Sequence, residues 1–380
     1  MKRLLENSPA LYQAVTAITT GVDAPPGTCL AVSQGGEITF AKTGFAQAFD
    51  DHGPLSNPPL LDLDTATDIA SVTKVLATTS ALIALSGADA LRLDQRLDEL
   101  LPWTKGLAAG AAQLAELLQH RAGLWEWWPL YLQGESPDAA LQAAASKPLR
   151  YQPGTARHYS DLGFILLGAV VAAARGGDLK QAVSELVLDP LGLHNTGYAS
   201  PPQERSNIAA GANGDAIERQ MIDSGLPYPV SAVSGDYHGW RQHVLVAEVN
   251  DGNAFHAFNS CSGHAGLFST ARDLLHYGDQ LLAGLRGEQP LLDRATCERF
   301  LTPGPDPAQA LGFRRWQLAS GPVFGHTGFT GVALGIMPEL QASVAMVTNR
   351  LHVQGQPRPT EALWLQALQS AELHLTGERR

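Results

Sequence analysis

The chain has few cysteines and no long apolar run, and each shortage excludes a class of protein. Only three of the 380 residues are cysteine, they are far apart, and no Cys-x-x-Cys occurs. A disulfide framework or a thiolate metal site is therefore not expected, and such isolated thiols favour a reducing compartment. The three residues are Cys29, Cys261 and Cys297.

Positive charge is also scarce. The 26 Lys and Arg residues are outnumbered by 37 Asp and Glu residues, which gives a formal net charge of −11 at pH 7. Without an extended basic cluster, nucleic acid and anionic membranes are poor partners. The longest apolar stretch, residues 162–174, is too short to span a bilayer, and Glu6 and Pro9 interrupt any signal-peptide pattern. We therefore expect a cytoplasmic protein with no membrane partner.

Strand patterns lie near both ends of the chain. Residues 27–42 carry two apolar runs around the turn Gln34-Gly35-Gly36, which predicts a hairpin. Residues 332–337 and 342–348 predict two further strands joined at Pro338-Glu339-Leu340. We predict an α/β lobe assembled from residues 1–90 and 264–380.

The middle of the chain, residues 91–263, looks different and predicts an inserted, mainly helical lobe. Its alanine- and leucine-rich segments are short and are broken by Pro, Gly and Trp, while residues 200–257 show little periodicity and predict long loops. Over the whole chain, the expected helices cover residues 9–20, 71–85, 107–120, 137–147, 161–175, 179–188 and 360–375.

The strongest chemical signal is Ser71-Val72-Thr73-Lys74 at the start of one of these helices. The spacing places the hydroxyl and the amine one helical turn apart on the same face. An unprotonated Lys74 amine could then accept the serine proton and make Ser71 a nucleophile. Two more motifs follow: Tyr159-Ser160-Asp161, which opens a helix, and His326-Thr327-Gly328, on an expected strand. They supply a second proton-transfer group and a strand edge beside a substrate.

These motifs, in this order, resemble those of the serine β-lactamase and penicillin-binding protein superfamily, and most closely its class C-like branch. That branch also holds esterases and D-amino-acid peptidases. Further similar segments carry the resemblance over most of the chain. They are residues 68–74, Leu117–Leu124, Pro153-Gly154 and Gly263–Thr270.

The resemblance implies an antiparallel sheet flanked by helices, with an acyl-enzyme on Ser71 and no cofactor. Lys74 and Tyr159 share the base role, in an order that stays open. The oxyanion is expected between the backbone N–H groups of Ser71 and Phe329. Asp161, His326, Gly328 and Phe329 are the expected substrate-binding residues.

Two residues depart from the usual family pattern. Asp161 stands where Asn is usual, and His326 stands where β-lactamases and peptidases usually have Lys. A mostly neutral histidine and an added carboxylate weaken the binding of a β-lactam carboxylate. This favours a small ester, or an amide with a free amine that Asp161 could bind. Asp161 also suits the N-terminus of a helix, where it could act in capping instead.

Several alternatives remain at this stage. A β-lactamase or a D-amino-acid peptidase would use the same three motifs, and an inactive sensor or binding module would keep the fold alone. A Gly-x-Ser-x-Gly motif is absent, which argues against an α/β-hydrolase. His238, His243, His256 and His264 lack His-Glu-x-x-His or similar spacing, so no metal is expected. His120 is expected to hold a turn, and the oligomeric state is not readable.

Overall fold

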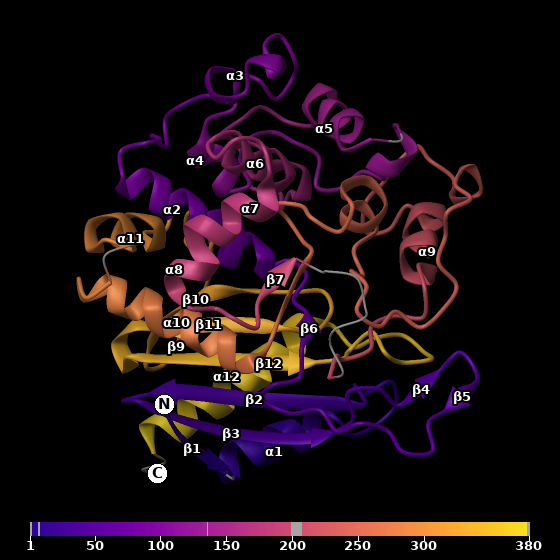
Figure 1. Ribbon diagram of the computed structural model, residues 1–380, viewed down its shortest axis with the longest axis vertical. Coiled ribbons are helices and arrows are strands. Elements are labelled where there is room, and N and C mark those ends of the chain that lie inside the picture. Colours follow the sequence, from indigo (N-terminus) through magenta and orange to yellow (C-terminus); the bar gives the residue numbers. More distant parts are fainter. Residues whose placement is uncertain (1, 7, 135, 199–206, 290, 378–380) are drawn as a thin grey trace.

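The computed structural model describes residues 2–6, 8–134, 136–198, 207–289 and 291–377 of the chain (Figure 1). Figure 1 shows a sheet with helices packed on both faces, and a broad set of helices and loops above it. Both termini lie beside the sheet. Among the described residues, no helix combines the length and the apolar character that crossing a membrane requires.

A seven-stranded sheet made from both ends of the chain is the framework of the fold. The strand order is β1-β3-β2-β12-β11-β10-β9, and β12 pairs with β2 along its full length. The strands are β1 (Arg3–Glu6), β2 (Gly27–Gln34), β3 (Glu37–Gly44), β9 (Arg314–Leu318), β10 (Gly321–Thr327), β11 (Ala333–Met337) and β12 (Ala342–Thr348).

The expectation of an antiparallel sheet was wrong at one edge. Strands β3, β2, β12, β11, β10 and β9 are antiparallel throughout. The edge strand β1, however, pairs in parallel with β3, so the sheet is mixed. Parallel neighbours need a crossover between them, and helix α1 (Pro9–Ile18) and strand β2 lie between β1 and β3 in the sequence. The short, half-polar β1 carried no strand pattern to reveal this.

Strand β12 shows why the sheet is buried on both faces. Alternate residues point to opposite faces of a strand. Val344 and Met346 join the apolar cluster under α1 and α12 (Thr360–Thr376). Ala345 and Val347 join the large cluster on the other face, which is covered by α10 (Ala271–Leu285). A run of apolar residues is therefore what this central strand requires.

The remaining helices and short elements lie mainly above the sheet. The α-helices are α2 (Ser80–Gly87), α3 (Leu97–Leu100), α4 (Leu114–Leu118), α5 (Pro137–Ser146), α6 (Asp161–Ala173), α7 (Leu179–Val183), α8 (Asp189–Leu191), α9 (Ala216–Ser224) and α11 (Arg294–Leu301). The π-helical segments are Lys74–Thr79, Ser184–Leu188 and Asn253–Ala257. The 3-10 turns are Pro102–Thr104, Leu130–Leu132, Ser234–Asp236 and Pro338–Leu340. The short strands are β4 (Phe49–Asp50), β5 (Gly53–Pro54), β6 (Thr67–Asp68), β7 (Gly197–Tyr198) and β8 (Leu267–Ser269).

Two expectations for this part were wrong. The helix predicted over residues 107–120 is only the short α4, because Gly106 adopts φ +81° and Gly110 packs directly on the carbonyl of Thr104. The stretch expected to be loops contains helix α9. The large apolar cluster runs through both predicted lobes, so the division at residues 90 and 264 stays a prediction.

Candidate active site

The turn that carries Ser71 is held in an unusual backbone conformation. Ala70 adopts φ +43°, which is uncommon for a residue with a side chain. The buried Asp68 side chain accepts a hydrogen bond of 2.8 Å from the Ala70 N–H, and Thr330 Oγ1 donates to the Asp68 carbonyl at 2.7 Å. The chain therefore leaves β6 at a fixed point, and Ser71 begins the helical turn that continues through Lys74.

The edge of β10 lies directly against this turn. A Cβ added to Gly328 would come within 2.4 Å of the Ile69 carbonyl oxygen, so only glycine fits there. Phe329 follows, with 38% of its surface exposed. Within the described ranges, the backbone N–H groups of Ser71 and Phe329 donate no hydrogen bond. Two unengaged N–H groups are what an oxyanion site requires, and the role expected for this pair stays a prediction.

Lys74 is fully buried, and polar groups surround its ammonium group. The Lys74 Nζ atom lies 2.9 Å from Ser71 Oγ and 3.1 Å from the His264 carbonyl oxygen. It also forms an ion pair of 2.7 Å with Asp161 Oδ1. The helical spacing thus brings Ser71 and Lys74 together, as the sequence predicted.

The groups around Lys74 act against the neutral amine that burial favours. Burial alone lowers the pKa of a lysine, which is the effect the sequence suggested. Here Asp161 and Tyr159 together outweigh burial, and the pKa of Lys74 lies above its usual range. Lys74 is therefore an ammonium ion in the resting site, and it must lose a proton before it can accept one from Ser71.

Tyr159 joins the same group of side chains. Its hydroxyl lies close enough to Lys74 and Ser71 for both to act on its pKa, and the Lys74 Nζ atom lies 5.0 Å from its ring centre. Burial raises the pKa of the Tyr159 phenol, and the Lys74 ammonium offsets part of that rise. Tyr159 is thus a neutral phenol at rest, with its oxygen turned to the serine.

His120 holds the loop that presents Tyr159. Its backbone adopts φ +56°, its Nδ1 accepts a hydrogen bond of 3.0 Å from the Ser160 N–H, and its carbonyl accepts one from the His158 N–H. Its ring also packs 4.6 Å from that of Tyr159, centre to centre. This agrees with the structural role expected for His120.

Asp161 begins helix α6 but does not cap it. The cap is Ser160, whose Oγ accepts a hydrogen bond from the Gly163 N–H at 3.1 Å. Asp161 instead turns to Lys74. Of the two roles open for this residue, the structure therefore places it in the site, where its charge is paired with that of Lys74 rather than free.

His326 lies deeper than expected for a residue that touches a substrate. Its imidazole is 1% exposed, and its ring centre lies 5.8 Å from that of Tyr159. Its Nδ1 lies 2.8 Å from the Thr327 carbonyl oxygen; because a carbonyl only accepts, Nδ1 carries the proton. Burial and the Lys74 ammonium hold the pKa of His326 well below its usual range. The residue is therefore uncharged, as the sequence predicted.

An aromatic wall borders the site. The rings of Trp127 and Tyr228 stack with centres 6.4 Å apart. Burial raises the pKa of the Tyr228 hydroxyl above its usual range, and the nearby Asp161 carboxylate adds to the rise. Tyr228 therefore lies close to the reacting groups, with one side packed on Trp127.

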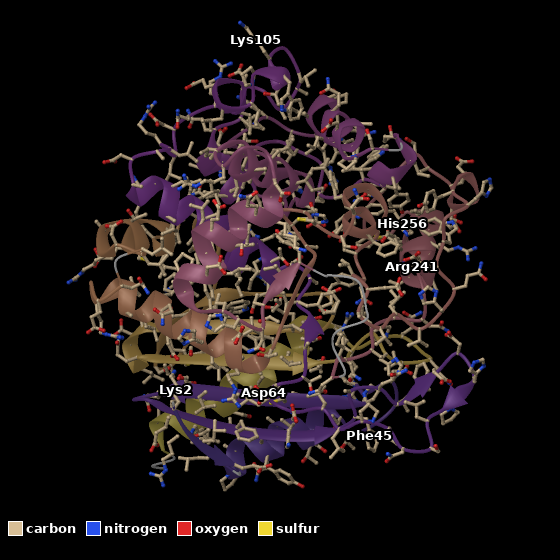
Figure 2. The ribbon with its side chains drawn as sticks, viewed as in Figure 1. Lys2, Phe45, Asp64, Lys105, Arg241 and His256 are labelled. Atoms are coloured by element: carbon tan, nitrogen blue, oxygen red, sulfur yellow. The ribbon has the colours of Figure 1, made fainter. Side chains whose placement is uncertain are left out.

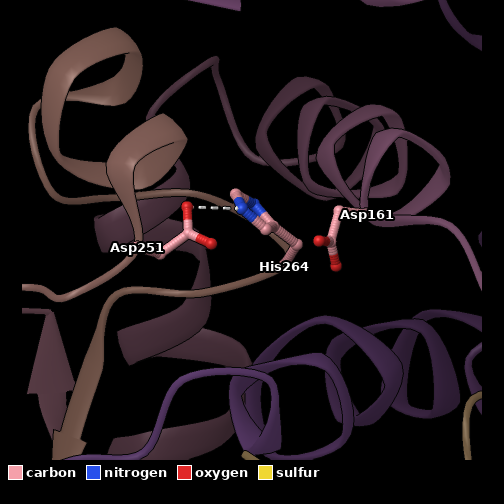
Figure 3. Close-up of side chains that lie close together, drawn as sticks. All are labelled: Asp161, Asp251 and His264. Atoms are coloured by element: carbon pink, nitrogen blue, oxygen red, sulfur yellow. Dashed lines mark hydrogen bonds and ion pairs between the residues drawn. The ribbon is translucent and has the colours of Figure 1, made fainter. Parts of the chain in front are cut away.

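Three residues of the kind that bind metals lie together behind Lys74. Ligand atoms of Asp161, Asp251 and His264 lie within 4.8 Å of one another (Figure 3). The cation beside them is the Lys74 ammonium, which contacts Asp161 and the His264 carbonyl. These three residues therefore surround the Lys74 ammonium, and the Asp161 carboxylate pairs with it directly.

Asp251 and His264 were missed as parts of the site. His264 lies in the Gly263–Thr270 segment that carries the family resemblance. The sequence therefore indicated this segment, but it did not indicate the role of His264. Asp251 lies in a stretch without periodicity, and no spacing connects it with Ser71. Only the folded loops bring these residues to Lys74.

Comparison with known proteins gives a consistent result. The sequence profile of the family described as Beta-lactamase matches residues 15–369. A Bacillus subtilis (strain 168) protein named N-acetylmuramyl-L-alanine amidase is 31% identical over 355 residues, which cover 86% of this chain and 78% of that protein.

Solved structures share the fold. A class C beta lactamase from Rhodobacter sphaeroides matches with a TM-score of 0.70 and 19% identity, over 97% of this chain and 100% of that one. A beta-lactamase/D-alanine carboxypeptidase from Pseudomonas syringae matches with a TM-score of 0.69 and 18% identity, over 95% and 98%. At these identities the likeness concerns the fold.

Proposed function

Because the chain belongs to the β-lactamase family of serine hydrolases, we propose that it hydrolyses a small amide or ester through an acyl-enzyme on Ser71. One observation carries the proposal: the Ser71 hydroxyl lies 2.9 Å from the Lys74 ammonium nitrogen, and the Tyr159 phenol is close enough for both groups to act on its pKa. A nucleophile in contact with two proton-transfer groups is the arrangement that acyl transfer requires.

In the proposed reaction, the Lys74–Tyr159 pair first gives up one proton to solvent. Ser71 Oγ then attacks the substrate carbonyl, and its proton passes to the deprotonated pair. The backbone N–H groups of Ser71 and Phe329 stabilise the oxyanion. The bond to the leaving group then breaks, and the pair returns the proton to the leaving nitrogen or oxygen. Water attacks the Ser71 ester in the second half and releases the acid. Which member of the pair takes the first proton stays open.

The substrate is proposed from the charges in the site. His326 is uncharged and Asp161 is paired with Lys74, so neither supplies a strong site for a β-lactam carboxylate. Neutralisation by Lys74 also weakens the repulsion that Asp161 was expected to exert, and it leaves Asp161 poorly suited to bind a substrate amine. The most similar relative reported above is named as an amidase, so an uncharged amide or ester is proposed.

We also propose a cytoplasmic location. All three cysteines are free thiols, and burial raises the pKa of Cys29 to about 12. Such thiols suit a reducing compartment. Cell fractionation with a tagged chain tests this independently of activity, and recovery in the periplasmic or secreted fraction would contradict it.

The function is tested by initial rates on p-nitrophenyl butyrate, nitrocefin and D-alanyl-p-nitroanilide side by side, with Ser71→Ala as the matched control. The expected result is clear hydrolysis of the ester, weak hydrolysis of nitrocefin, and loss of both in Ser71→Ala. A wide preference for nitrocefin or for the anilide would replace the proposed substrate by a β-lactam or a D-amino-acid peptide. No turnover and no labelling of Ser71 by a fluorophosphonate would favour a binding module.

A further inference from the structure

The Lys74 ammonium donates a hydrogen bond to the His264 carbonyl. This carbonyl belongs to a loop in which side chains from other elements donate to the carbonyl groups. Three successive carbonyls of this loop accept from three different side chains. Tyr198 Oη donates to the Ser262 carbonyl at 3.0 Å, Thr78 Oγ1 to the Gly263 carbonyl at 2.6 Å, and Lys74 Nζ to the His264 carbonyl at 3.1 Å. The position of the last carbonyl therefore depends on how this loop is fixed.

The His264 side chain fixes the loop at this point. It is buried, and both of its ring nitrogens are engaged. Nε2 lies 2.9 Å from Asp251 Oδ1, and Nδ1 lies 2.8 Å from Ser262 Oγ. Asp251 is itself held by the Ala254 N–H at 2.8 Å. The imidazole thus ties the carbonyl that Lys74 uses to a carboxylate in the preceding loop (Figure 3).

Asp251 also acts on Lys74 through its charge. Burial opposes ionisation of Asp251, but His264, the Ala254 N–H and the Lys74 ammonium outweigh it, and the pKa of Asp251 lies below its usual range. Lys74 therefore has two carboxylates near it: Asp161 in direct contact and Asp251 behind the His264 carbonyl.

We propose that Asp251 and His264 are positioning residues for Lys74: they orient the carbonyl that accepts a hydrogen bond from its ammonium group, and they place a second negative charge beside it. This rests on the proposed roles of Ser71 and Lys74. Neither residue touches the reacting atoms. Their effect is to keep the ammonium aligned with Ser71 and to set the pH at which Lys74 can give up a proton.

The charged and titratable groups around Lys74 come from several elements, and all of them bear on this pH dependence. Asp161 and Tyr159 are in direct contact, and Asp251 lies behind them. His120 and His326 are neutral, because burial and the Lys74 charge lower the pKa of each. Beyond Asp251, the Glu218 carboxyl has its pKa raised to about 8 by burial and by Asp251. Asp251 is therefore the second ionised carboxylate at neutral pH.

The test is the pH dependence of Ser71 labelling by a fluorophosphonate, measured as a rate constant in the wild type, Asp251→Asn and His264→Gln. Removing the Asp251 charge makes the ammonium easier to deprotonate, so the acid limb of the profile should move to lower pH by about one unit. His264→Gln should slow labelling by about tenfold or more at every pH. Because only folded enzyme reacts, the midpoint of the profile is readable even if part of a variant is unfolded.

His256→Gln is the matched control. His256 forms the same kind of buried pair, because its Nε2 lies 3.0 Å from Asp215 Oδ2. It lies in the same part of the chain, and no hydrogen bond joins it to Lys74 in the residues described. It should leave the midpoint unchanged. The proposal is overturned if Asp251→Asn keeps the wild-type midpoint or if His256→Gln moves it as far. Absence of labelling in the wild type would instead overturn the proposed function.

Discussion

The seven-stranded sheet and the loop segment of residues 207–266 are held together by different interactions. The sheet packs between two apolar clusters, one under α1 and α12 and the other shared with α10. The loop segment contributes to smaller apolar clusters, one of which consists only of Ala212, Leu245 and Leu351. Burial of apolar area therefore explains the sheet, but it does not explain how the loops keep one conformation.

The loop segment is fixed largely by polar side chains. Arg241 and Asp215 form a buried ion pair of 2.6 Å, and His256 lies 3.0 Å from the same carboxylate (Figure 2). Arg241 also donates to the Val249 carbonyl at 2.8 Å. These bonds join the π-helical segment that holds His256 to stretches around Asp215, Arg241 and Val249 that have no regular secondary structure.

The active site lies where the two kinds of structure meet. Ser71 and Lys74 come from a helix packed in the large apolar cluster, whereas the His264 carbonyl and Asp251 come from the loop segment. Sequence patterns find the first pair and not the second. Local spacing therefore sets the contact between Ser71 and Lys74, whereas tertiary contacts set the charge state of Lys74.

The largest effect is expected for Lys74→Arg, at the junction of the two regions. A guanidinium keeps the charge but does not deprotonate, and its planar shape does not match the three partners of a fully buried ammonium. Turnover should fall on the order of 10³-fold or more, close to the loss in Lys74→Ala. Steady-state rates with the best substrate measure this, and substantial acylation by Lys74→Arg would identify Tyr159 as the base.

Asp215→Asn tests whether polar bonds hold the loop segment. It removes the closer carboxylate partner of the buried Arg241 and leaves only Glu248 at 3.7 Å, which should lower the free energy of unfolding by about 3 kcal/mol. Glu298→Gln is the control: it breaks the exposed Arg294–Glu298 pair of 2.7 Å and should cost under about 0.5 kcal/mol. Urea denaturation gives both values. Equal, small losses would show that the ion pair does not fix these loops.

Two leucine truncations compare the apolar packing of the two regions. Leu30→Ala in β2 opens a cavity in the cluster under α1 and α12, and Leu245→Ala affects only the small three-residue cluster. Both side chains are buried. Within the range of about 2–5 kcal/mol for such changes, Leu30→Ala should be the more costly. A larger loss of unfolding free energy for Leu245→Ala would contradict the contrast.

His352 joins the two regions and should make stability depend on pH. Its Nε2 accepts from the Ala48 N–H at 3.1 Å, and its Nδ1 donates to the Gly211 carbonyl at 3.3 Å. Burial lowers its pKa to about 4. The unfolded chain then binds a proton more readily, so stability is complete above pH 6.5 and is lost as pH falls toward 4.

Between pH 7 and pH 5 the expected loss from His352 is about 2 kcal/mol. Other buried histidines titrate as well, so the quantity to measure is the difference between the wild type and His352→Gln in urea unfolding at the two pH values. His352→Gln should lose less stability on acidification. Equal losses of unfolding free energy in the two proteins would mean that His352 is protonated in the folded state.

Much of the framework could be predicted from the sequence. The hairpin of β2 and β3, strands β11 and β12, and helices α1, α5, α6 and α12 follow from apolar periodicity and turn residues such as Gly35 and Gly36. The parallel edge strand β1 could not be predicted, because its four residues Arg3–Glu6 are largely exposed and carry no alternation.

The site was predictable where it depends on spacing. Ser71 and Lys74 are one turn apart, so their contact follows from the helix. The protonation of Lys74 does not follow, because it depends on Asp161 from α6 and on Asp251 from a loop. The burial of His326 likewise depends on the rings that pack around it. Long-range charges and irregular loops are therefore the part that sequence reasoning misses.

The central claim is that Ser71 becomes acylated during turnover, and intact-protein mass spectrometry after rapid acid quenching tests it most directly. With p-nitrophenyl butyrate, the wild type should gain the mass of one butyryl group, and peptide mapping should place that group on Ser71. Ser71→Ala should gain none. Turnover by Ser71→Ala at the wild-type rate, or an acyl group on another residue of the wild type, would contradict the account.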